Sequence, residues 1–109
     1  MNHEIPDPES CNDMADVRLG VDATDRELMA LLARRYGYMR AAARIKADRD
    51  TVRDERRKAQ VIQHARADAE NRQLPGNDIA QIWDALVESS IAYELEEWDR
   101  LRSGPLAAG

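Results

Sequence analysis

The sequence contains no phenylalanine, one cysteine, five glycines and four prolines among its 109 residues. The lone cysteine, Cys11, cannot form a disulfide within the chain, and we therefore expect a cytoplasmic protein. No apolar run approaches the roughly 18 residues that a membrane-spanning helix needs. The N-terminal stretch MNHEIPDPESCND has neither a basic nor an apolar segment, so no secretory signal is expected. These absences argue against a membrane protein and against a disulfide-rich secreted domain.

Charge and helix-forming residues are abundant instead. Charged residues make up 34% of the chain and hydrophobic residues 43%, and Ala, Leu, Arg, Glu and Asp are prominent. This composition favours helices over strands, and the length is that of one domain with a thin core. The net charge of −5 argues against non-specific binding to nucleic acid, whose backbone is also negative. We expect a single all-α domain.

Apolar residues recur at helical spacing in three segments. The predicted helices cover residues 14–47, 52–71 and 78–102. The third begins after QLPGN, with Asn77 or Asp78 as its N-cap. The helical domain therefore spans 14–102, between a flexible N-terminal arm, 1–13, and a flexible tail, 103–109.

The length of the first predicted helix indicates a dimer. About 33 residues at about 1.5 Å each give a helix of about 50 Å. A compact chain of this size has a radius of gyration of only about 13 Å, and the two later helices are too short to cover the first. A second copy packed along the first helix would bury its apolar stripe. We therefore expect an intertwined homodimer.

Three cations return to the apolar side of this first helix: Arg18, Arg35 and Lys46. Arg35 and Lys46 stand eleven residues apart, so they share one side of the helix at a separation of about 16 Å. Two long side chains at that separation can reach one small ligand. Arg18 lies about 42 Å from Lys46, which no small ligand spans. In an antiparallel dimer, however, Arg18 of one chain can approach Arg35 and Lys46 of the other.

A simpler explanation applies to each cation alone, because arginine and lysine stems often lie on apolar surface while the charge reaches water. The third predicted helix favours a binding site instead. Its apolar stripe includes Ser90 and Glu94, and an unpartnered carboxylate in a core is costly. Cations and polar groups directed inward from two helices are typical of an anion-binding pocket.

Other kinds of site find little support in the sequence. His3 and His64 lack metal-ligand spacing relative to each other or to Cys11, so we expect no metal. The serines have no His/Asp pairing that would create a nucleophile, and there is no glycine-rich phosphate loop. The charged run RDERRKAQ, residues 53–60, is mostly a solvated face, from which we single out Arg57 because it lies on the inner side.

These residues, taken in order, resemble the all-α chorismate mutase class and, within it, the isochorismate pyruvate lyase branch. The segment MADVRLGVDATDRELMALLARR is similar to the opening of the family, in which an Arg is followed seven residues later by Asp, a Leu-rich run and a paired Arg. Lys46 stands eleven residues after Arg35, as the family's lysine does, and VRDERRKA resembles the start of its second helix. Cys11 and Trp98 are similar to the lyase branch in particular. The resemblance covers about residues 11–101 and implies a dimer of three-helix chains, with one arginine donated across the dimer.

The resemblance implies an enzyme without a cofactor. Chorismate carries two carboxylates and rearranges to prephenate by a pericyclic shift, with no nucleophile or metal. Catalysis then consists of holding the compact conformer and stabilising the charge that develops on the ether oxygen. By similarity, Arg35 and Arg18 of the other chain would clamp carboxylates. Arg57 would assist at a carboxylate, and Ser90 would lie near the ring carboxylate.

Lys46 and Glu94 are the implied catalytic residues. Lys46 would donate to the ether oxygen and a carboxylate, and position 94 would supply the second donor to that oxygen. The family commonly has Gln there, whereas Glu94 can donate only when protonated, so we hypothesise that turnover rises as the pH falls. Lys58 is a second departure, because mutases often have a Glu at this position that meets the substrate hydroxyl, and the lyase branch does not keep it. Lys58 therefore weakens the mutase assignment, or else it simply points to solvent.

Our leading hypothesis is a chorismate mutase that acts as a homodimer on a small dicarboxylate. The nearest alternative is an isochorismate pyruvate lyase, which would give salicylate and pyruvate from almost the same pocket, and a mutase acting on an amino-substituted chorismate is another. A non-catalytic helical dimer that serves as a scaffold or activates another enzyme is the alternative from a different class. In that last case, alanine at Arg18, Arg35 or Lys46 would alter only stability.

Overall fold

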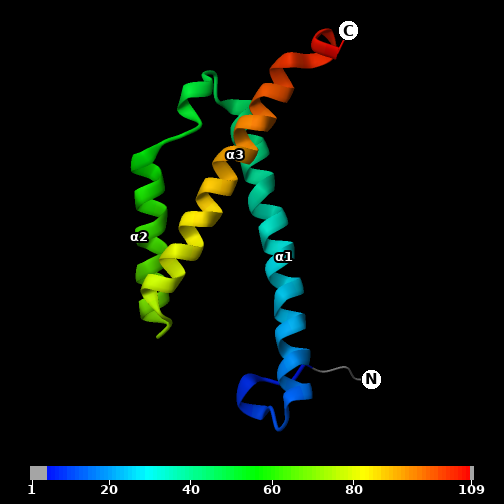
Figure 1. Ribbon diagram of the computed structural model, residues 1–109, viewed down its shortest axis with the longest axis vertical. Helices are drawn as coiled ribbons and strands as arrows, with labels where there is room; N and C mark the ends of the chain where they lie inside the picture. Colours follow the sequence, from blue (N-terminus) through cyan, green and yellow to red (C-terminus); the bar gives the residue numbers. More distant parts are fainter. Residues whose placement is uncertain (1–4, 109) are drawn as a thin grey trace. The chain divides into compact units, whose positions relative to one another are not determined.

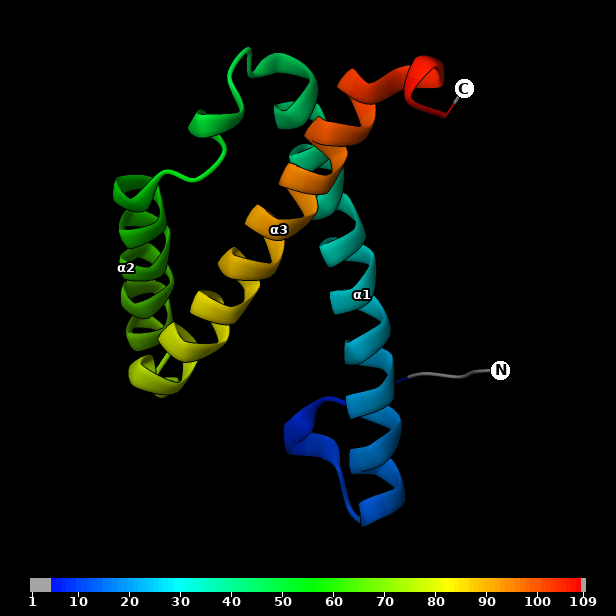
Figure 2. The same ribbon diagram turned by 45° about the horizontal axis from the view of Figure 1, so that its top comes forward.

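The computed structural model describes residues 5–108, with side chains through residue 103, and its regular structure is helical (Figures 1 and 2). In chain order the elements are η1 (Pro8–Ser10), α1 (Met14–Ile45), η2 (Arg49–Thr51), α2 (Glu55–Asn71) and α3 (Gly76–Ala108), where η marks a short 3-10 helix. No strand occurs within residues 5–108, so the predicted all-α class with three helices is confirmed. Over the same residues, no helix is both long and apolar enough to cross a membrane.

The chain forms two compact units that divide between Arg35 and Tyr36, within α1. In the first unit, two hydrogen bonds to aspartate side chains define the start of α1. The Asp13 carboxylate accepts from the Asp16 backbone N–H at 2.9 Å, and the Asp16 carboxylate accepts from the Asn12 N–H at 3.0 Å. This arrangement resembles a capping box and explains why α1 begins where the sequence predicts.

Apolar side chains remain exposed along the part of α1 that belongs to the first unit. Each of them is more than a third exposed, and the exposed fraction reaches 66% at Met29: Met14, Val17, Leu19, Val21, Leu28, Met29 and Leu31. A single chain thus leaves uncovered most of the stripe that the sequence assigns to a core.

In the second unit, α2 and α3 run antiparallel and pack against each other (Figures 1 and 2). The turn between them closes with two hydrogen bonds, from Leu74 N–H to the Ala69 carbonyl at 2.8 Å and from Gln73 N–H to the Glu70 carbonyl at 3.0 Å. This is the Schellman pattern, and it places Gln73 in the left-handed region with φ of 63°. Glycine is the residue usually found there, so Gln73 makes the turn at some cost in stability.

The core of the second unit is small. It consists of the buried residues Val52, Val87 and Ile91, against which Val61, Leu95 and Trp98 pack. Val87 and Ile91 lie on successive turns of α3 and on the same face, as their spacing of four residues indicates.

The second part of α1 is joined to α3 by tyrosines. The Tyr36 and Ser89 hydroxyls lie 2.6 Å apart, and Arg40 donates to the Tyr93 hydroxyl at 2.9 Å. The Tyr36 and Tyr93 rings meet edge to face, with centroids 5.0 Å apart. These contacts hold the second part of α1 against α3.

Three predicted helix boundaries are wrong. The second helix begins at Glu55 rather than at 52, because Asp54 caps it by accepting from the Arg57 N–H at 3.0 Å. The third begins at Gly76, directly after Pro75, so neither Asn77 nor Asp78 is its N-cap. It also continues to Ala108, so the predicted tail is helical through that residue, beyond the Ser-Gly-Pro sequence that was expected to end it.

Candidate functional site

Lys46 and Glu94 form an ion pair where the end of α1 meets α3. The Lys46 ammonium lies 2.8 Å from Glu94 Oε2, and the Glu94 side chain is only 5% exposed, against 30% for Lys46. Lys46 is the residue that follows Ile45, the last of α1, while Glu94 lies in the middle of α3. A carboxylate this deeply buried is costly unless charge and hydrogen bonds compensate it.

That compensation is incomplete. The Lys46 ammonium neutralises Glu94 by charge at 2.8 Å, but the buried Oε2 atom has no hydrogen-bond partner among the residues that the structure describes. Such groups are rare in native structures and each calls for an explanation. The oxygen has unused capacity for a partner from outside the chain.

Ser90 lies one turn before Glu94 on the same face of α3 and is also buried. Its hydroxyl donates to the Leu86 carbonyl at 2.7 Å, within the helix. The predicted polar pair on the third helix is therefore buried, as its place in the apolar stripe indicated.

The backbone of Lys46 is held from both sides. Its N–H donates to the Ala42 carbonyl at 2.9 Å. Its own carbonyl accepts from Trp98 Nε1 at 3.1 Å and from Arg102 Nη2 at 2.7 Å. Arg102 was not predicted from the sequence, although a cation four residues after Trp98 and eight after Glu94 shares their side of the helix.

Lys58 does not point to solvent. Its ammonium lies 2.7 Å from Glu88 and 3.1 Å from Asp84, both on α3, and its side chain is 19% exposed. Arg53 reaches the same Glu88 at 2.6 Å. These contacts raise the pKa of Lys58, through Glu88 first and Asp84 second, and Arg53 and Lys58 together lower the pKa of Glu88 to about 2.

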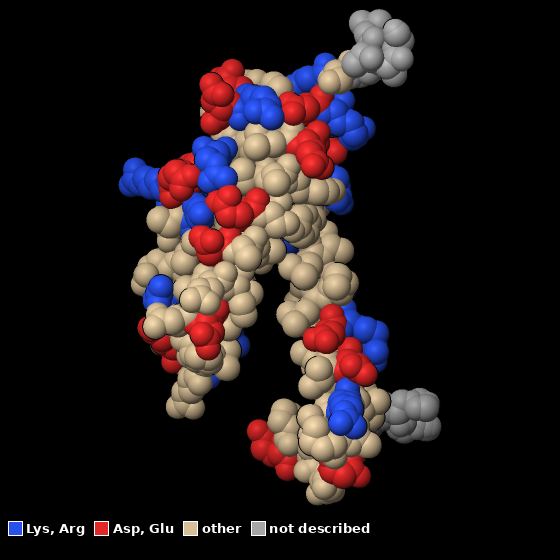
Figure 3. Space-filling model, in the orientation of Figure 1, with Lys and Arg blue, Asp and Glu red and all other residues tan. Residues whose placement is uncertain are grey.

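Charged side chains of both signs are interspersed on one face of the molecule. On the face shown in Figure 3, Lys and Arg side chains lie beside Asp and Glu side chains rather than gathering by sign.

Arg57 is exposed on the first turn of α2. Its guanidinium donates to the Gln60 side chain, on its own helix. It also lines an open groove of about 340 Å³ together with Val61, His64, Ala65, Asp68 and Trp83. Its contact with a substrate carboxylate remains a prediction.

Arg18 and Arg35 lie in the first unit, whereas Lys46 and Glu94 lie in the second. Arg18 is exposed, and Arg35 is partly buried and engaged in interactions of its own. The composite site that would join these arginines to Lys46 therefore stays a prediction.

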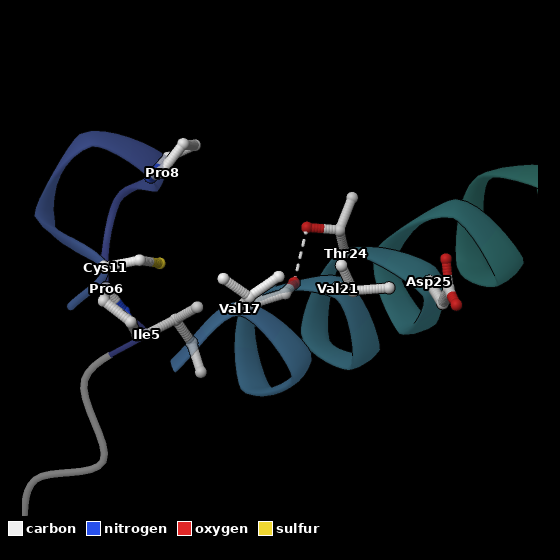
Figure 4. A pocket seen from close by; sticks show the side chains of 9 residues that line it. Ile5, Pro6, Pro8, Cys11, Val17, Val21, Thr24 and Asp25 are labelled. Atoms are coloured by element: carbon white, nitrogen blue, oxygen red, sulfur yellow. Dashed lines mark hydrogen bonds between the residues drawn. The ribbon is translucent and has the colours of Figure 1, made fainter. Parts of the chain in front are cut away.

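The first unit contains a pocket of its own, of about 340 Å³ (Figure 4). Its lining combines the N-terminal segment with the first turns of α1: Ile5, Pro6, Pro8, Cys11, Val17, Gly20, Val21, Thr24 and Asp25. Cys11 donates weakly to the Asp7 carbonyl at 3.6 Å, and desolvation, followed by the charge of Asp16, raises the pKa of its thiol. This cysteine is therefore held as a neutral thiol and is not activated as a nucleophile.

Within residues 5–108, no three side chains of His, Cys, Asp or Glu gather as a metal site would require. His3, which the sequence analysis considered as a ligand, lies outside the described residues.

Comparison with known proteins identifies the family. The family model described as chorismate mutase type II matches residues 17–95, well over half of the chain. The isochorismate pyruvate lyase of Pseudomonas aeruginosa is 27% identical over 95 residues, which cover 87% of this chain and 94% of that protein. The matched segment includes Lys46 and Glu94, most of α1 and the part of α3 up to residue 95. The chain belongs to the chorismate mutase type II family.

Proposed function

We propose that the protein is a chorismate mutase, which rearranges chorismate to prephenate without a cofactor. The observation that carries the proposal is the Lys46–Glu94 pair, in which Glu94 Oε2 is buried and has no hydrogen-bond partner within the described part of the chain. A fold that needed only a core would be better served by apolar residues at these positions. An ammonium and a carboxyl group that lie 2.8 Å apart could both reach one substrate oxygen that gains negative charge during the reaction.

In this mechanism the protein supplies no nucleophile. The substrate's ether C–O bond breaks while a new C–C bond forms, and negative charge develops on the ether oxygen. Lys46 Nζ donates to that oxygen from one side. Glu94 donates from the other side once it has taken up a proton, because an ionised carboxylate has no hydrogen to give. The family resemblance assigns the two substrate carboxylates to arginines, which bind them in bidentate fashion where the geometry allows.

The proposal includes a homodimer in which Arg18 of one chain completes the site of the other. The exposed apolar residues of the first part of α1 support it, since seven such side chains on one segment mark an interaction surface. A second copy would cover this surface and bring the distant arginine toward Lys46. Arg35 and Arg57 are proposed as the carboxylate ligands from the same chain as Lys46, and Ser90 as a polar neighbour of the ring carboxylate.

Isochorismate pyruvate lyase is the second candidate, and two observations favour it. The Pseudomonas aeruginosa relative bears that name and aligns with nearly the whole chain. In addition, position 58 is a lysine, whose ammonium forms ion pairs with Glu88 and Asp84. An ammonium cannot accept a hydrogen bond from a substrate hydroxyl, whereas mutases often have a Glu here that meets this hydroxyl. The products would then be salicylate and pyruvate.

One experiment separates these candidates. The purified protein is given chorismate and isochorismate in parallel, and prephenate, salicylate and pyruvate are followed with time. Prephenate from chorismate supports the mutase, and salicylate with pyruvate from isochorismate, without prephenate, replaces it by the lyase. Consumption of neither substrate favours the non-catalytic dimer. Lys46→Ala is the matched negative control, and Arg72→Ala, which alters an exposed pair with Asp68 on α2, is the positive one.

A further inference from the structure

We propose that Arg102, with Trp98, is a positioning residue that fixes the backbone of Lys46 so that its ammonium reaches Glu94. The inference rests on the proposed function only in that Lys46 acts on the substrate. Neither Arg102 nor Trp98 touches the reacting atoms in this proposal.

Lys46 occupies a weak place in the chain. The last carbonyl groups of an α-helix have no partner within the helix, and helix ends fray. Lys46 follows Ile45, the last residue of α1, so its own carbonyl lies beyond the helical ladder. Its side chain is long and flexible, so any freedom of this backbone would be passed on to the ammonium.

Two donors from α3 remove that freedom. Trp98 Nε1 and Arg102 Nη2 donate to the Lys46 carbonyl at 3.1 Å and 2.7 Å, which uses both of its lone pairs. The other end of the same guanidinium, Nη1, donates to the Ala43 carbonyl at 2.9 Å. The planar fork of Arg102 thus bridges the last turn of α1, where a positive charge is also favourable.

Arg102 is itself held in place. Its guanidinium carbon lies 4.2 Å from the centre of the Trp98 ring, a cation–π contact. Glu94, Trp98 and Arg102 follow one another at intervals of four residues along α3, so they form a single row on one face of the helix. The row therefore determines both ends of Lys46: Trp98 and Arg102 hold its backbone, and Glu94 holds its ammonium.

The arrangement is specific to arginine. Lysine at 102 would keep the charge but could not bond two carbonyls in a fixed plane. Arg100 provides a matched control two residues away, because its own side chain is 68% exposed and pairs with Glu97 at 2.7 Å on the same helix.

The kinetic test uses the substrate that the wild-type protein consumes. A displacement of the donor by an ångström can lower the rate about 100-fold, so we expect Arg102→Ala to lower kcat by about 10- to 100-fold with a smaller change in KM. Arg102→Lys should give an intermediate value, and Arg100→Ala should stay within about twofold of wild type.

A double-mutant cycle then separates positioning from general stability. In a Lys46→Ala background, Arg102→Ala should change kcat/KM by less than about twofold, because the residue it positions is gone. An equal loss in both backgrounds would show that Arg102 does not act through Lys46 and would overturn the proposal. If Arg102→Ala does not fold, Trp98→Phe serves in its place, since it removes only the indole donor.

Hydrogen exchange provides a measurement that does not need activity. The Lys46 N–H, bonded to Ala42, and the neighbouring amides should exchange at least about tenfold faster in Arg102→Ala than in Arg100→Ala. Unchanged exchange at these amides would contradict the proposal even if the enzyme is active. If the wild-type protein consumes neither substrate but Arg102→Ala still shows faster exchange, the anchoring of Lys46 by Arg102 is supported and the proposed function is refuted.

Discussion

The two units of the chain differ in what they complete on their own. The unit that begins at Tyr36 has a small core, a Lys46–Glu94 pair and a group of ion pairs around Glu88. The unit that ends at Arg35 has exposed apolar side chains along its helix, and the one buried residue of α1, Ala43, lies in the other unit. In the proposed enzyme, the second unit would supply Lys46 and Glu94, and the first would supply Arg18 and an apolar surface to a second copy of the chain.

The largest expected change in activity is its recovery when two inactive variants are mixed. If Arg18 serves the site of the other chain, Arg18→Ala and Lys46→Ala should each lower kcat/KM by about 100- to 1,000-fold. Chains mixed and allowed to exchange should then recover about a quarter of wild-type activity, because half of the dimers are mixed and each mixed dimer has one intact site. No recovery, with exchange verified by mass spectrometry, would place Arg18 outside the site or within its own chain's site.

The surface of the first unit can be disrupted directly. Leu28→Asp combined with Leu31→Asp should turn the dimer into monomers and remove most of the activity, since these side chains are 52% and 59% exposed in a single chain. Sedimentation would report the mass, and Leu74→Asp, at an exposed apolar residue of the second unit, is the control. An unchanged mass in the double variant would mean that this surface is not the interface.

The pH dependence of activity tests the role of Glu94 in the second unit. The wild-type kcat/KM should rise by about tenfold or more as the pH falls from about 8 to about 5, because only the protonated carboxyl donates. Glu94→Gln carries a permanent donor and should give a flat profile that exceeds wild type at neutral pH. A flat wild-type profile over the same range would refute the role assigned to the protonated Glu94.

The ion pairs at Glu88 should make the second unit sensitive to acid. The pKa of Glu88 is lowered from 4.5 to about 2 by Arg53 and Lys58, so its contribution to stability is present above about 4.5 and is lost as the pH falls toward about 2. Glu88→Gln should lower the unfolding midpoint in urea at pH 7 and flatten its decline between these two pH values. An identical decline in wild type and variant would assign the acid sensitivity to other groups.

The smallest effect is expected at the turn between α2 and α3. Gln73 has a φ of 63°, and Gln73→Gly should raise the free energy of unfolding by about 0.5–1 kcal/mol by relieving the left-handed conformation. Gln73→Ala keeps the Cβ atom and should be close to neutral. A lower melting temperature for Gln73→Gly would indicate that its side chain makes a stabilising contact.

The fold class and much of the polar pair on α3 could be predicted from the sequence. Helical periodicity identified all three helices, and the place of Ser90 and Glu94 in an apolar stripe correctly indicated that both are buried. The helix ends were less predictable, because they depend on contacts between segments. The third helix was expected to end at 102, yet Arg102 bonds the end of α1 and the helix continues beyond it.

Residues that act between helices were the hardest to find. Arg102 bonds backbone carbonyls, and these have no signature in the sequence. Lys58 was interpreted either as a departure from the Glu that mutases often have or as a residue that points to solvent. In the structure it binds Glu88 and Asp84, thirty and twenty-six residues later. A charge pattern within one helix could not show this, because the partners come from different helices.

The row of Glu94, Trp98 and Arg102 also limits how the chain can change length. One residue inserted between positions 94 and 102 would rotate the later part of α3 by about 100° and carry the anchors away from Lys46. The segment between α1 and α2 and the turn between α2 and α3 have no such row to keep in phase. Insertions and deletions among relatives that keep this arrangement should therefore fall in those two connections and spare this stretch of α3.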